Sequence, residues 1–81
     1  MTKSADIKKE MLKMIEENAV LWGKAKARHD DIESTAYKLR VFTLVTALAR
    51  IGVIVPKTTV QKYVRKGYEP LVGWNLAIHK S

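Results

Sequence analysis

The most restrictive feature of the sequence is an apolar stretch over residues 41–55, interrupted only by two threonines and one arginine. A helix that spans a membrane needs about 20 apolar residues, so this shorter stretch predicts a helix buried inside the protein. Because residues 41–49 are apolar on nearly every side, we expect that helix to be central and covered by its neighbours. Gly52 follows, and a glycine in this place predicts the left-handed residue that ends a helix.

Signals for helix ends divide the first half of the chain. Apolar residues recur at helical spacing over residues 5–28, which predicts a first helix, with Gly23 as a point where it ends or bends. A break follows, where Asp30 and Glu33, three residues later, are typical of a capping box. The second helix is therefore expected over residues 31–51.

The second half of the chain leaves more than one arrangement open. Residues 53–55 are β-branched and extended in character. A third helix follows, beginning at Pro56 or capped by Thr58, and is expected to stop at Gly67. Residues 70–79 fit either a fourth short helix or a strand that pairs with residues 53–55, which would make a winged variant of the fold.

Length and composition indicate one small domain over residues 1–81, mainly all-α, with three to four helices and a short strand at 53–55 as the open alternative. A chain of this size buries only about 60–65% of its unfolded surface, so we expect modest stability and a homodimer through the first helix. The sequence has no cysteine and begins with polar residues, which favours a cytoplasmic protein without disulfides, a secretory signal or a membrane span.

Charge is distributed unevenly along the chain. Residues 1–33 contain seven basic and seven acidic side chains, whereas residues 34–81 contain eight basic side chains and a single acid, Glu69. The net charge of +7 therefore belongs entirely to the C-terminal part. Such asymmetry points to a polyanionic partner.

Two helices around Gly52 carry a resemblance to a known motif. Residues 46–53 end one helix, and residues 58–67 form the next one. This pair resembles a helix-turn-helix, in which a glycine ends the supporting helix and β-branched side chains hold the second helix against it. Residues 65–70 are also similar to the end of the recognition helix in small excisionase-type regulators. The connection over residues 53–57 is longer and more apolar than a tight turn.

The resemblance implies a small non-enzymatic regulator that binds nucleic acid, with duplex DNA as the leading target. Val60, Tyr63 and Val64 form the inward side of the third helix, so the opposite side is expected to enter the major groove. Three side chains there are expected to face bases, and four more to hold phosphates. The first group is Gln61, Lys62 and Arg65, and the second is Arg50, Lys57, Thr58 and Lys66.

A second reading is a small protein-binding inhibitor or adaptor of the kind that phages and mobile elements encode, with its basic face docked on an acidic partner. No catalytic residue, metal site or cofactor is expected. The serines lie in no nucleophile-elbow pattern, and the glycines form no phosphate loop. His29 has acids beside it, but the sequence offers no second histidine nearby to complete a metal site.

Overall fold

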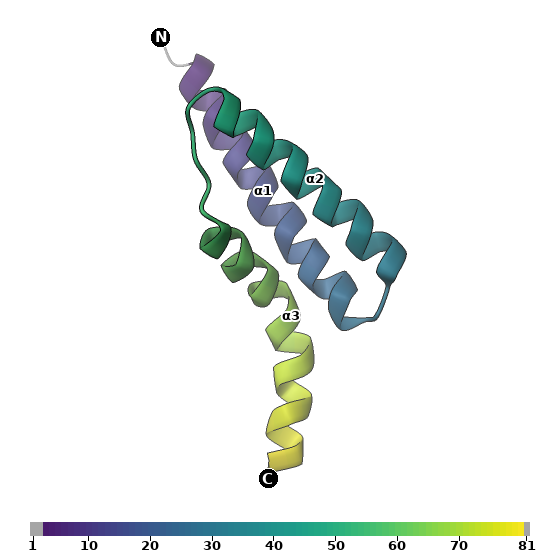
Figure 1. Ribbon diagram of the computed structural model, residues 1–81. Helices are drawn as coiled ribbons and strands as arrows, with labels where there is room; N and C mark the ends of the chain where they lie inside the picture. The colour runs from purple at the N-terminus through teal and green to yellow at the C-terminus, as the bar shows by residue number, and fades with distance from the viewer. Residues whose placement is uncertain (1–2, 81) are drawn as a thin grey trace.

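Three helices make up the fold: α1 (Lys3–Ala27), α2 (Asp31–Arg50) and α3 (Lys57–Lys80). The computed structural model describes the backbone of residues 3–80 and the side chains of residues 6–70. α1 and α2 form an antiparallel hairpin, and α3 returns along another side of α1 (Figure 1). The all-α fold expected from the sequence is confirmed, and residues 3–80 contain no strand.

The central helix is α1, because both α2 and α3 pack against it, while α2 and α3 do not pack against each other within the described residues. The expectation that the apolar second helix is central is therefore wrong. Of its side chains only Val41 and Leu48 are buried, whereas Leu39 is 58% and Phe42 48% exposed. An apolar surface shows that a helix can be buried by packing, but it does not show that other helices of the same chain pack against it.

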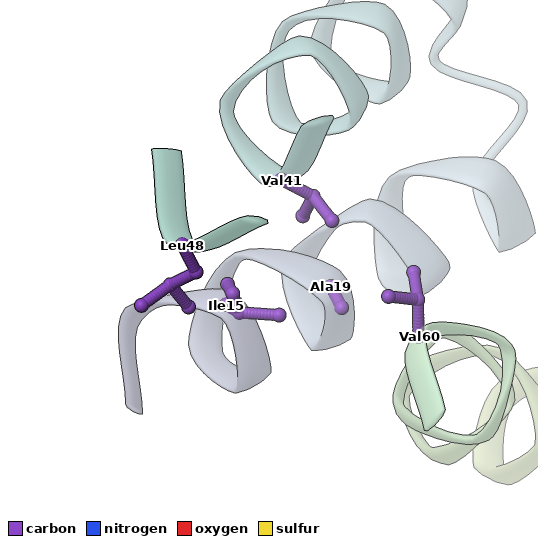
Figure 2. Packing of buried hydrophobic residues seen from close by; sticks show 5 residues of the cluster. All are labelled: Ile15, Ala19, Val41, Leu48 and Val60. Carbon is purple, nitrogen blue, oxygen red and sulfur yellow. The ribbon is translucent and has the colours of Figure 1, made fainter. Parts of the chain in front are cut away.

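The hydrophobic core is small and joins all three helices (Figure 2). α1 contributes Ile15 and Ala19, α2 contributes Val41 and Leu48, and α3 contributes Val60. The Cα atoms extend over 54 × 25 × 17 Å, so few side chains lie far from solvent. Each fully buried aliphatic side chain contributes about 1.5–3 kcal/mol, and a core of this size implies modest stability.

The turn between α1 and α2 is a Schellman motif with histidine in the position that glycine usually takes. His29 has a φ of 59°, in the left-handed region. Its N–H donates to the Lys26 carbonyl at 3.1 Å, and the N–H of Asp30 donates to the Ala25 carbonyl at 2.9 Å. These bonds satisfy carbonyls at the end of α1, at the cost of a left-handed conformation in a residue that has a Cβ.

Asp30 caps the start of α2, as its sequence position predicts. Its Oδ1 accepts a hydrogen bond from the backbone N–H of Glu33 at 3.0 Å. The reciprocal half of a capping box is replaced by an ion pair, because the Glu33 carboxylate contacts Arg28 at 2.7 Å. This ion pair links Arg28, in the turn that follows α1, to the first turn of α2.

Gly52 ends α2 in the predicted left-handed conformation, with a φ of 85°. Its N–H donates to the Ala49 carbonyl at 3.1 Å, and the N–H of Val53 donates to the Leu48 carbonyl at 2.9 Å. Val53 packs on the core that includes Leu48, which is the hydrophobic contact that commonly accompanies this motif.

Residues 53–56 are an extended connection without strand pairing, so the strand expected at 53–55 is not formed. Its proposed partner, residues 70–79, is helical. The connection leads to α3, where the Pro56 carbonyl accepts from the N–H groups of Thr59 at 3.0 Å and Val60 at 3.3 Å. Pro56 thus precedes the helix directly, and Thr58 lies within the first turn rather than capping it.

α3 continues through Gly67 and Pro70 to Lys80, so the expected stop at Gly67 and the separate fourth helix are both wrong. Pro70 is exposed, and it removes one backbone donor from the helix without ending it. The run of residues that suggested a short fourth helix therefore extends α3, which projects beyond the end of α1 (Figure 1).

Two glycines that weaken helix predictions bring α1 and α3 into backbone contact. A Cβ at Gly23 would collide with the Val64 carbonyl oxygen and lie 2.9 Å from the Tyr68 nitrogen. A Cβ at Gly67 would collide in the same way with the Val20 carbonyl oxygen. Only glycine fits on both sides of this crossing, so these residues set how closely the two helices approach.

Candidate nucleic-acid interface

α3 presents one face to α1 and the opposite face to solvent. Val60 is buried, while Tyr63 and Val64 are half-buried against the core, as their spacing predicts. Since the three side chains occupy one side of the helix, residues between them point away from α1. We call this exposed side the outer face of α3, made up of Thr58, Gln61, Lys62, Arg65, Lys66 and Glu69.

The outer face of α3 is hollowed rather than flat. Its six side chains line a shallow depression of about 370 Å³, and five of them are among the seven side chains predicted to contact nucleic acid. The distance along the axis from Thr58 to Lys66 is about 12 Å, from a rise of 1.5 Å per residue. The major groove of DNA is about 12 Å wide and admits an α-helix with its side chains.

Lys57 and Arg50 complete the predicted set but occupy different places. Lys57 is the exposed first residue of α3, one helical turn before Gln61, so it extends the outer face towards the connection. Arg50 is the last residue of α2, and its neighbours around a separate hollow are Leu39, Phe42, Thr43, Thr46 and Ala47. The structure therefore gathers the predicted residues of α3 but not Arg50.

Two of the cations on the outer face form ion pairs. Arg65 contacts Glu69 at 2.7 Å, one turn further along α3, and Lys66 contacts Glu16 of α1 at 3.2 Å. Both pairs are exposed, and exposed pairs contribute only about 0–1 kcal/mol. A phosphate can therefore compete for either cation at little cost. Lys62 forms no ion pair within the described residues.

Beside the outer face lies a surface of mixed character. Lys66 also borders a hollow of about 470 Å³ whose other lining residues belong to α1. These are the exposed or half-buried side chains Lys13, Glu16, Glu17, Val20 and Leu21. Acids and aliphatic groups so close to the basic side chains are less typical of a nucleic-acid interface than of a protein interface.

The helix-turn-helix geometry itself is not formed. In that motif the supporting helix packs on the recognition helix, but here α2 and α3 are held apart and share only α1 as a neighbour in the described residues. The long connection over residues 53–56 permits this separation. Comparison with known proteins gives no support for any family, since no family model, no curated protein and no solved structure matches the chain.

The residues that the structure describes form neither a metal site nor a membrane-spanning helix. Nowhere among them do three histidine, cysteine, aspartate or glutamate side chains come together as metal ligands would. The acids near His29 instead cap α2 and pair with Arg28. None of the described helices is long and apolar enough to cross a membrane.

α2 also carries an exposed strip that was not expected from the sequence. On the side opposite Val41 lie six exposed residues whose spacing alternates between four and three. This spacing is the seam pattern of paired helices and is visible in the sequence, but the buried pattern of the same helix obscured it. We call this surface the outer strip of α2, and its residues are Ile32, Ala36, Leu39, Thr43, Thr46 and Arg50.

Proposed function

We propose that this protein is a small non-enzymatic regulator that binds nucleic acid, duplex DNA in the first place, through the outer face of α3. The observation that supports this proposal is the gathering of Thr58, Gln61, Lys62, Arg65 and Lys66 around one exposed hollow. Hydroxyl, amide and cationic groups are the donors that proteins use towards phosphates and base edges. The net charge of +7 adds long-range attraction to a polyanion.

The geometry favours one helix acting alone rather than a helix pair. α3 is supported from behind by α1, and its basic side faces outwards along about two turns. Phosphate contacts then supply most of the binding free energy, with Gln61 and Arg65 as the candidates for base contacts. We therefore expect strong salt dependence and only a modest preference for sequence.

The decisive experiment reverses two charges on the outer face. In Lys62→Glu with Arg65→Glu, affinity for a random duplex should fall by at least about 100-fold at low salt, since two cationic contacts become repulsive. The matched control is Lys38→Glu with Arg40→Glu on α2, which changes the net charge equally at two exposed positions. Gel shifts against duplex, single-stranded DNA and RNA at two salt concentrations measure both variants, with circular dichroism as the check on folding.

If both double variants lose the same affinity, binding depends on net charge and not on the outer face. If neither loses any, the proposal is wrong. A milder variant gives a quantitative test, because Lys66→Ala removes one phosphate contact. We expect it to weaken all duplex sequences alike and to reduce the slope of log K against log salt by about one unit.

The rival proposal is a protein-binding inhibitor or adaptor that docks the same basic side chains on an acidic partner. The mixed hollow next to Lys66 favours this reading, because Val20 and Leu21 offer aliphatic contact area beside the charges. A pull-down from a nuclease-treated lysate separates the two. One protein retained by the wild type and lost in Lys62→Glu with Arg65→Glu, together with no gel shift, would establish the rival.

A further inference from the structure

The outer strip of α2 has the properties of a helix–helix seam without a partner in the described chain. Leu39 is 58% exposed and Ile32 85% exposed, although both are large aliphatic side chains. Phe42 flanks the strip and is half exposed, while its ring meets Trp22 edge to face at 6.0 Å between centroids. The apolar contact area therefore lies along the first half and the middle of α2, while Thr43, Thr46 and Arg50 make the second half of the strip polar.

We propose that two copies of this chain pair through the outer strip of α2, antiparallel and related by a two-fold axis that passes between Leu39 and Thr43. A two-fold interface brings the same surface of both copies together, so that surface must be self-complementary. A two-fold axis allows the two helices to run either parallel or antiparallel, and the charged residues at the ends of α2 favour the antiparallel pair. This pairing does not depend on what α3 binds.

The charged residues at the two ends of α2 decide whether the paired helices run parallel or antiparallel. The first turn of α2 carries the acids Asp31 and Glu33, and its last turn carries Arg50. In an antiparallel pair, Arg50 of one copy lies opposite Ile32 of the other, beside Asp31 and beside Glu33, whose carboxylate also pairs with Arg28. A parallel pair would instead place Arg50 against Arg50 and acids against acids, which is destabilising.

The centre of the pair is compatible with close contact. Leu39 of one copy lies opposite Thr43 of the other, and the small side chains of Ala36 and Thr46 face each other further along. Arg40 flanks this region, but it stacks on Tyr37 of its own helix at 5.5 Å from the ring centroid. Its charge is therefore drawn back towards the α1–α2 hairpin.

The size of the contact sets the expected affinity. One helix pair of the length of α2 buries on the order of 600 Å² per copy, at the low end for specific interfaces. We therefore expect a dimer that dissociates in the range of about 1–100 μM, rather than an obligate one. The strip is too poor in cations to be a second nucleic-acid surface, since Arg50 is its single basic member.

Sedimentation equilibrium of the full chain across this concentration range tests the proposal. Leu39→Glu places a carboxylate in the seam and should weaken dimerisation by at least about 100-fold. Ile7→Glu is the matched control, because Ile7 lies on α1 with almost the same exposure, 59%. We expect Ile7→Glu to dimerise like the wild type.

A wild type that stays monomeric at several hundred micromolar would overturn the proposal. So would a dimer that survives Leu39→Glu, whether or not Ile7→Glu dissociates it. Dissociation by Ile7→Glu alone would support pairing through the first helix instead.

Direction is tested by disulfide formation, since the natural chain has no cysteine. Ile32 and Arg50 lie about 27 Å apart along α2, from 18 residues at 1.5 Å each. In the antiparallel pair, Ile32→Cys and Arg50→Cys should cross-link when the two variants are mixed, and neither should cross-link alone. If each variant cross-links with itself and no disulfide joins the two variants in the mixture, the helices run in the opposite, parallel direction.

Discussion

Replacing Gly23 by alanine tests the crossing of α1 and α3, because two physical effects predict opposite signs. In a helix that contacts nothing, alanine is more favourable than glycine by about 1 kcal/mol. At Gly23, however, the new methyl group would collide with the backbone of α3 at Val64 and Tyr68. Backbone atoms cannot rotate away as a side chain does, so α3 must shift as a whole.

We expect the free-energy cost of the collision to exceed the gain in helix propensity. Overpacking of a well-packed site costs about 1–3 kcal/mol, and an obstacle made of backbone places Gly23→Ala at the upper end. Subtracting the gain in helix propensity leaves a net loss of about 2 kcal/mol in the free energy of unfolding. For a domain of this size, that loss lowers Tm by about 8–16 °C.

Urea denaturation followed by circular dichroism measures this effect, and Ala49→Gly provides the control. Ala49 is exposed on α2 outside the outer strip, so its replacement reports the alanine–glycine difference without a collision and should cost up to about 1 kcal/mol. Combining Gly23→Ala with Gly67→Ala should cost less than the sum of the single changes, since both act at one crossing. A Gly23→Ala protein that is more stable than the wild type by about 1 kcal/mol would refute the close approach of the helices.

Substitutions at three further positions test the ends of the helices, all by denaturant unfolding. Gly52→Ala should destabilise the protein by about 1–2 kcal/mol, although a Cβ there would meet no atom within 4 Å, because its φ of 85° is left-handed. His29→Gly should raise stability by up to about 1 kcal/mol, since His29 already has a φ of 59°, and no change would mean that this conformation carries no strain. Asp30→Ala removes the acceptor for the Glu33 N–H and should cost about 1 kcal/mol, whereas Asp30→Asn should keep most of that stability.

The parts of the fold that the sequence predicts well are those decided by neighbouring residues. Asp30 can cap α2 because its acceptor reaches a backbone donor three residues away, and Gly52 can end α2 because its own backbone conformation is permitted. The inward stripe of Val60, Tyr63 and Val64 follows from helical spacing alone. Each of these signals is complete within a few residues, so no knowledge of the distant chain is required.

The failures share a different cause. A glycine inside a helical pattern either ends the helix or admits a neighbouring backbone, and only the packing partner decides between these outcomes. Gly23 and Gly67 lie at the same crossing of α1 and α3, where a Cβ on either helix would collide with the backbone of the other. Because 43 residues separate them in the sequence, no local pattern reveals this packing. Likewise, the apolar character of α2 correctly predicted a helix but wrongly placed it at the centre of the fold. The sequence pattern of a helix does not show which other helix packs against it.

The candidate interface was partly predictable for the same reason. Thr58, Gln61, Lys62, Arg65 and Lys66 belong to one helix, so their spacing was enough to place them on one side. Arg50 belongs to another helix, and its distance from that side depends on how the connection over residues 53–56 runs. The ion pair of Lys66 with Glu16 also required the packed structure.

The central position of α1 divides the molecule into parts that can open separately. Among the described residues, α2 and α3 each contact α1 and not each other. We therefore expect that α3 can detach while the α1–α2 hairpin stays folded. Amides of α3 should therefore exchange with solvent through a smaller, sub-global opening than those around Val41 and Ile15. A ligand bound to the outer face of α3 would raise the protection of these amides first, so hydrogen exchange would report binding on the helix that carries that face.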